Sequence, residues 1–81
     1  MKITDNNTLA DFLKAVDKAS GAVYLKSRYG DIYNLKSMLS RYVAIAALLG
    51  QHGDELELFC DNKQDESLFF DFFHKHAEVL Q

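Results

Sequence analysis

The sequence predicts a single α+β domain, and two observations lead to this fold class. Along the chain, the apolar residues switch several times between the spacing of an amphipathic helix and the alternation of a strand. At 81 residues, the chain has room for one domain, which we expect to span residues 1–81. The predicted order is strand, helix, strand, strand, helix, strand, helix. That order favours a small antiparallel or mixed sheet with its helices on one face.

The N-terminal part predicts a short strand over residues 2–4, a turn over residues 5–7 and a first helix. Thr8 is the expected N-cap of this helix, and Gly21 is expected to end it with a positive φ. Four apolar residues at helical spacing form its buried stripe: Leu9, Phe12, Leu13 and Val16.

The next segment predicts a hairpin. Val23 and Leu25 alternate with Tyr24 and Lys26 over residues 22–27, as in a strand with one solvated face. A turn containing Gly30 follows, and residues 32–35 are expected to return as the second strand.

Ser37 is the expected N-cap of a second helix that runs to about Leu49. The apolar positions of this helix are too widely distributed for a single stripe. Either the helix is buried on two sides, or one side is a surface for a partner.

The C-terminal part predicts a strand over residues 55–60, with Cys60 on its inward side, and a last helix capped by Asn62. Asp65 and Glu66 suit the first turn of that helix, where negative charge is favoured. Its stripe is expected to comprise Phe69, Phe72, Phe73, His76 and Leu80.

Composition limits the classes of function and location. The net charge is −3 and the nine basic residues are scattered, which argues against a nucleic-acid partner. The longest apolar run, residues 42–49, is far shorter than the roughly 20 residues that span a bilayer, so we expect no membrane partner. A single cysteine and a polar N-terminus without a signal peptide favour the cytoplasm.

Three stretches of the chain resemble a known family. Residues 33–38 read YNLKSM, residues 53–58 read GDELEL, and Asp65-Glu66 opens the last helix. These segments and the element order resemble the HPr family, the small phosphocarrier proteins of the bacterial sugar phosphotransferase system. The resemblance covers roughly residue 22 to the C-terminus. It implies an HPr-like open-faced sandwich, a four-stranded antiparallel sheet with three helices on one face.

The chain departs from this family where the phosphate is carried. Phosphocarrying members hold a histidine at the start of the first helix, within Gly-Leu-His-Ala-Arg-Pro. Here residues 6–12 read NNTLADF, without histidine, arginine or proline, and Asp11 adds negative charge. We therefore expect a divergent member that lacks the phosphocarrier histidine.

The resemblance also implies that Ser37 is a candidate for regulatory phosphorylation by a dedicated serine kinase. The alternative is that Ser37 serves only as an N-cap, a role worth about 1 kcal/mol. The candidate partner surface lies around Ser37 and along the second helix, and comprises Lys36, Met38, Leu39, Tyr42 and Val43.

The three histidines give no catalytic or metal pattern. His52 lies in a glycine-flanked loop, and His74 and His76 are two residues apart, so on a helix they face different directions. We expect no enzymatic activity, no cofactor and no metal. The first hypothesis is a regulatory or binding module for a protein partner, such as a phosphotransferase-system component or a transcriptional regulator. The alternatives are a phosphocarrier that uses another residue, or a structural, self-associating domain that uses residues 42–49.

Overall fold

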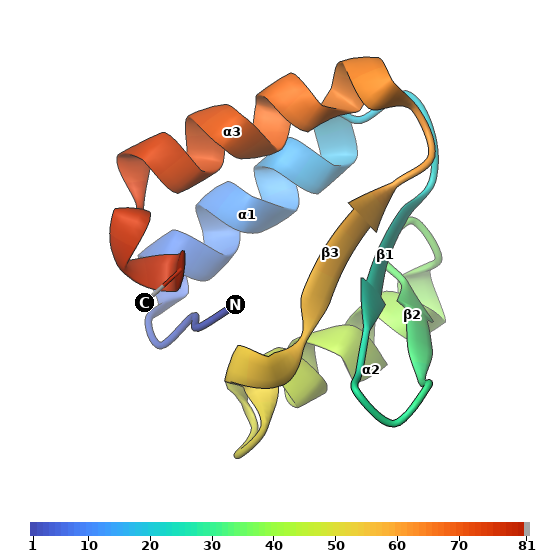
Figure 1. Cartoon of the computed structure of the whole chain (residues 1–81), viewed down its shortest axis with the longest axis vertical. Coiled ribbons are helices and arrows are strands. Elements are labelled where there is room, and N and C mark those ends of the chain that lie inside the picture. The colour runs from blue at the N-terminus through green and yellow to red at the C-terminus, as the bar shows by residue number, and fades with distance from the viewer. Residues whose placement is uncertain (81) are drawn as a thin grey trace.

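The computed structural model describes residues 1–80 and contains three α-helices packed with a three-stranded antiparallel sheet (Figure 1). This confirms the predicted α+β class and the number of helices. The helices and strands are α1 (Asn6–Lys18), β1 (Val23–Lys26), β2 (Ile32–Asn34), α2 (Met38–Leu49), β3 (Glu57–Cys60) and α3 (Glu66–Lys75). Three short 3-10 helices complete the chain: η1 (Gly53–Glu55), η2 (Lys63–Asp65) and η3 (Ala77–Leu80).

The sheet has the order β2-β1-β3, with Leu25 of β1 opposite Tyr33 on one side and Leu58 on the other. Because side chains alternate along a strand, Val23 and Leu25 lie on the same face. Both are fully buried and belong to the core that the helices share. The opposite face carries Phe59, which is 40% exposed, so no helix covers that residue.

The core lies between the sheet and the helices. Phe12 of α1 has no exposed surface, and its ring centroid lies 6.1 Å from that of Phe69 and 5.5 Å from that of Phe72. These contacts hold α1 and α3 side by side (Figure 1). Ala44 and Leu48 attach α2 to the same core.

The predicted first strand over residues 2–4 is not formed, so the sheet has three strands among residues 1–80 instead of four. The Lys2 backbone N–H donates to the Val79 carbonyl at 2.8 Å, and Ile3 is 3% exposed within the core. The segment is therefore held by its hydrogen bond to η3 and by the burial of Ile3. The Lys2 N–H that binds Val79 is not available to pair with a strand of the sheet.

The N-cap of α1 is Asp5, and the prediction of Thr8 is wrong by one turn. The Asp5 carboxylate accepts the Thr8 backbone N–H at 2.7 Å and the Thr8 hydroxyl at 2.9 Å. Thr8 thus forms part of the cap from inside the helix, where it is 4% exposed. A carboxylate at this position is favoured by both hydrogen bonding and the helix dipole.

The end of α1 also differs from the prediction. The helix stops at Lys18, with Ala19 extended at the C-cap, and Gly21 does not have a positive φ. Its N–H is instead bound by the distant Asp65 carboxylate at 2.9 Å. The glycine with a positive φ is Gly30, at 93° in the β1–β2 turn. That turn needs the left-handed backbone which glycine adopts freely.

The last helix, α3, begins further along the chain than predicted and is shorter. Asn62 precedes η2, and its side chain donates to the Ser20 hydroxyl rather than capping a helix. After α3 the backbone breaks at His76, and η3 continues with three residues per turn. Because the number of residues per turn changes, Val79 is buried and Leu80 is 64% exposed. The prediction that Leu80 belongs to the buried stripe is therefore wrong.

Candidate functional site

The exposed side of α2 carries five of the ten large hydrophobic side chains that are exposed in the described part of the chain. We call it the α2 face and define it as Met38, Leu39, Tyr42, Val43 and Leu49, which are 50–81% exposed. Met38 and Tyr42 are four residues apart, as are Leu39 and Val43, so the two pairs form adjacent rows on the helix. Four of the five predicted partner-surface residues therefore share one exposed face.

Lys36, the fifth predicted residue, has its ammonium bound elsewhere. Its Nζ donates to the carbonyls of Val16 at 3.2 Å and Ala19 at 2.8 Å, at the C-terminal end of α1. The Val16 carbonyl also accepts the Ala19 N–H at 3.1 Å, and a cation at this end interacts favourably with the helix dipole. Lys36 thus joins α1 to the start of α2.

Arg41 is the one charged residue within α2, and it too is engaged. Its Nε donates to the Leu35 carbonyl at 2.9 Å, and its guanidinium pairs with Asp17 of α1. The α2 face is consequently uncharged, which is unusual for the exposed side of a helix in a monomeric protein.

Ser37 occupies the N-cap position of α2, as predicted, but its side chain makes no capping hydrogen bond. Its carbonyl accepts the Arg41 N–H at 2.8 Å, which begins the helix. The side chain is half-buried and lies next to Met38 of the α2 face. A group added at Ser37 would stand at the N-terminus of α2 and at the edge of that face.

A cleft of about 450 Å³ separates α1 from α2 beside the α2 face. Leu13 from α1 and Tyr42 and Ile45 from α2 supply apolar walls, and Asp17 lies at its rim together with Arg41. Sequence reasoning missed the contribution of α1, because no local pattern relates residues that are 24 or more positions apart, as Asp17 and Arg41 are. The cleft makes the surface concave where α2 meets α1.

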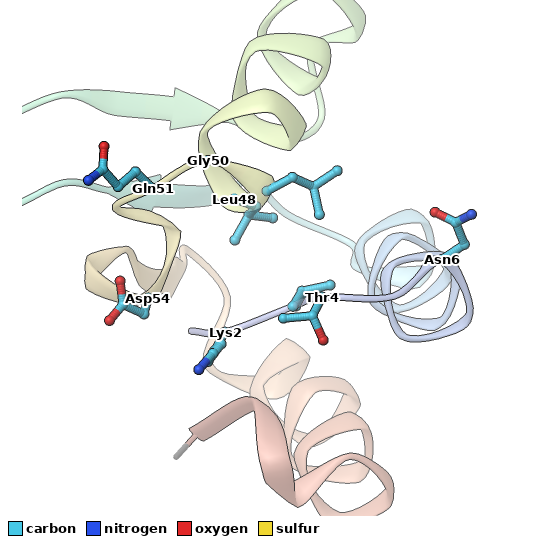
Figure 2. A pocket seen from close by; sticks show the side chains of 9 residues that line it. Lys2, Thr4, Asn6, Leu48, Gly50, Gln51 and Asp54 are labelled. Atoms are coloured by element: carbon cyan, nitrogen blue, oxygen red, sulfur yellow. The ribbon is translucent and has the colours of Figure 1, made fainter.

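A second hollow, of about 520 Å³, lies at the C-terminal end of α2. Figure 2 shows that its walls come from the N-terminal segment, the end of α2 and η1, with Lys2, Gln51 and Asp54 at its border. Lys2 and Asp54 are the charged residues among the described residues that line it, and no histidine is among them.

The N-terminus of α1 is where the resemblance places a phosphate-carrying histidine. Here the Asp5 carboxylate occupies the helix end, and the hydrogen bond from the Thr8 backbone N–H holds the pKa of Asp5 below its ordinary value. An anion is thus already bound to the N–H groups that would otherwise stabilise a phosphate.

A histidine does reach this region from the other end of the chain. His76 Nε2 lies 2.8 Å from Asp11 Oδ2, and its Nδ1 lies 3.5 Å from the Thr8 hydroxyl and 3.4 Å from Glu78 Oε1. The His76 hydrogen bond, followed by that of Lys75, lowers the pKa of Asp11. His76 is 14% exposed and lies at the edge of the core, as its place on the stripe predicts.

The other histidines remain separate. His52 is 63% exposed, with Nδ1 3.7 Å from Glu55 Oε2, and His74 is exposed. Within residues 1–80, histidine, cysteine and carboxylate side chains form no group of three or more that could hold a metal ion. No helix in that part of the chain has the length and apolarity needed to cross a membrane.

Searches of protein-family models, of curated proteins and of solved structures found no match to this chain.

Proposed function

We propose that the chain is a non-enzymatic binding module that docks a partner protein on the α2 face. The observation that carries this proposal is the exposure of five large apolar side chains on one helix, among them Leu39 at 81% and Met38 at 73%. An uncharged, contiguous apolar surface of this kind is typical of protein–protein contact sites. The cleft beside Tyr42 would receive a side chain of the partner.

We also propose that the fold is a divergent HPr-like sandwich. From α1 onward, the order helix, strand, strand, helix, strand, helix agrees with the order that the resemblance implies, and the sheet is antiparallel with one open face. On this proposal the partner is a component of the phosphotransferase system or a transcriptional regulator, and the module acts in the cytoplasm.

Ser37 is the proposed regulatory position on this surface. A phosphate there would accept hydrogen bonds from the free N–H groups of the first turn of α2 and add nearly two negative charges beside Met38. The Lys36 ammonium could pair with this phosphate only if it broke its hydrogen bonds to the Val16 and Ala19 carbonyls. Phosphorylation would therefore change the charge at the edge of the α2 face without a new ion pair from Lys36.

The α2 face is tested by photo-crosslinking in cells, with p-benzoylphenylalanine in place of Leu39 or, as a control, of Ile32. Ile32 is 61% exposed but lies on the sheet. The proposal expects a discrete adduct from position 39 that disappears when Val43→Glu is added. Identical adducts from both positions, or none from position 39, would contradict it.

Light scattering separates a partner from self-association. If the chain dimerises with concentration and Leu39→Glu abolishes the dimer, the α2 face joins two copies of this chain and the partner-protein proposal fails. A strict monomer that still forms the position-39 adduct supports a different protein as the partner.

Intact-mass measurements test the phosphorylation states. Incubation with ATP and the family's serine kinase should add one phosphate to the wild type and none to Ser37→Ala. Incubation with phosphoenolpyruvate and the general phosphotransferase enzyme should add none, because no histidine stands at the N-terminus of α1 and both ring nitrogens of His76, the histidine nearest to it, face carboxylates. A phosphate gained from phosphoenolpyruvate would instead establish the phosphocarrier alternative.

A further inference from the structure

The outer side of β3 is an unpaired sheet edge. β3 has β1 on one side, and no strand of residues 1–80 pairs with its other side (Figure 1). The Asp61 N–H donates to the Ala22 carbonyl at 3.0 Å, and backbone groups alternate between the two sides of an antiparallel strand. Leu58 and Cys60 therefore direct their N–H and C=O groups outward. Such an edge is a template for another strand.

A groove lies next to this edge. Two hollows of about 230 Å³ and 520 Å³ share Leu58 and Phe73 as lining residues, so they follow one another along β3. The smaller lies between β3 and α3 and is lined mainly by apolar and aromatic side chains. Phe70 and Leu80, each 64% exposed, stand on the helical side of the groove.

The chain's own N-terminus shows that the edge accepts a donor. The Met1 ammonium lies 3.0 Å from the Leu56 carbonyl and 3.0 Å from the Asp54 carbonyl. Leu56 is two residues before Leu58, so its carbonyl belongs to the same outer edge. The chain then leaves the edge, because the Lys2 N–H binds Val79. The part of the edge formed by Leu58 and Cys60 stays free for a second chain.

The charge of the groove indicates what kind of chain fits. Asp54, Glu55, Glu57 and Glu66 line it, and Glu55 already pairs with Arg28 Nη1 at 3.2 Å. The Met1 ammonium is the one cationic group among its described lining residues. Burial raises the pKa of the Cys60 thiol, and the Glu66, Asp65 and Asp61 carboxylates raise it further. A second copy of β3 would bring the same carboxylates against these, which is unfavourable. An occupant with basic residues is favoured.

We propose that the outer edge of β3 and the groove beneath α3 bind an extended segment of a partner protein in which apolar and basic residues alternate. The backbone of the segment pairs with Leu58 and Cys60, which is the mode of strand addition. Because side chains alternate between the faces of a strand, the apolar ones enter the groove beside Phe70 and Phe73. The basic ones lie on the open face near Glu57. This surface is separate from the α2 face and does not depend on it.

The test begins with a random heptapeptide library on phage, selected on the full chain and counter-selected on Phe70→Glu. Phe70 is largely exposed, so the substitution leaves the core intact. The expected result is enrichment of sequences in which apolar and basic residues alternate. A synthetic copy of the most enriched peptide should shift the amide signals of Leu58 and Cys60, and its Kd should rise at least tenfold with Phe70→Glu. Leu39→Glu, on α2, is the matched control and should bind the peptide unchanged.

Backbone methylation decides whether strand pairing carries the binding. N-methylation of alternate peptide residues should abolish binding in one register and spare it in the other, because only every second N–H faces the edge. The proposal is overturned by a library that enriches nothing over Phe70→Glu, or by chemical shifts confined to α2. It is also overturned by affinity that methylation in either register leaves unchanged, or by a dimer that pairs β3 with itself.

Discussion

Asp65 shows how one charged residue can be both buried and stabilising. Its carboxylate is 4% exposed and accepts hydrogen bonds from the Ser20 N–H at 3.0 Å, the Ser20 hydroxyl at 3.1 Å and the Gly21 N–H at 2.9 Å. These donors lie just after α1, where the chain turns toward β1. A buried carboxylate is tolerated when several donors satisfy it, and here the same bonds join the end of α1 to the start of α3.

The pH dependence of stability follows from the pKa of Asp65. The Ser20 N–H, followed by the Gly21 N–H, holds that pKa below its ordinary value of 3.8. Ionised Asp65 therefore adds to the free energy of unfolding above about pH 4, and the gain is lost as pH falls through the lower folded pKa. We expect Asp65→Asn to be less stable at pH 7 and to lose less stability between pH 5 and pH 3. Urea unfolding at each pH measures this.

The exposed Asp71 provides the control for this prediction. Asp71→Asn should follow the wild-type profile at every pH. A profile for Asp65→Asn that runs parallel to the wild type would mean that another carboxylate causes the acid dependence.

A second prediction at the residue scale concerns the contact between Asp11 and His76. The His76 hydrogen bond is the main cause of the lowered pKa of Asp11, and the Lys75 hydrogen bond is the next. His76→Phe should therefore return the pKa of Asp11 toward its ordinary value, and Lys75→Met should do so by a smaller amount. Carboxyl carbon NMR measures both titrations. An unchanged Asp11 titration in His76→Phe would show that this pair does not form in solution.

At the scale of elements, the contact between α1 and α3 depends on aromatic packing. Phe12 is fully buried between Phe69 and Phe72, while Phe70 on the same helix as those two is 64% exposed. We expect Phe12→Ala to lower the free energy of unfolding by about 3–5 kcal/mol. Phe70→Ala should change it by about 0.5 kcal/mol or less.

Chemical denaturation followed by far-UV circular dichroism measures both variants. Equal losses for the two variants would contradict the packing of α1 on α3. Both substitutions replace phenylalanine by alanine, so the difference between the two losses of unfolding free energy reflects how deeply each side chain is buried.

Among the four glycines, Gly53 in the turn after α2 has the least room for a side chain. A Cβ at Gly53 would lie 1.9 Å from the Leu48 carbonyl oxygen, and backbone cannot move aside as a flexible side chain can. Gly53→Ala should therefore shift the turn and lower the free energy of unfolding by more than about 1 kcal/mol. Gly50→Ala is the control, since its nearest contact is at 3.1 Å, and thermal unfolding compares the two.

At the scale of the whole molecule, one hydrophobic core includes buried residues from all three α-helices and from β1. A small domain with a single core is expected to unfold in one transition. The α2 helix contributes Ala44 and Leu48 as buried residues. Its free side carries five of the ten large hydrophobic side chains that are exposed in the described part of the chain.

The local periodicities were sufficient to predict most of the elements. Helical spacing from Leu9 to Val16 and alternation from Val23 to Lys26 depend on near neighbours, and both elements form where predicted. The apolar residues after Ser37 are too widely distributed for one stripe, which predicted that α2 is either buried on two sides or exposes an apolar side. In the tertiary structure this side is exposed, because β2 and η1 pack against α2 and leave Met38, Leu39, Tyr42, Val43 and Leu49 uncovered.

The sequence by itself therefore determined the α+β class, the three helices, the hairpin and the inward faces of the strands, all of which follow from interactions between neighbours. Only the tertiary structure decided which backbone groups found distant partners. The N-terminal segment binds Val79 instead of forming a strand, Asp65 binds Ser20 and Gly21, and β3 keeps an open edge. The first two outcomes join residues that are more than 40 positions apart. No local pattern encodes such contacts, or the lack of a partner for β3, because both depend on how the whole chain packs.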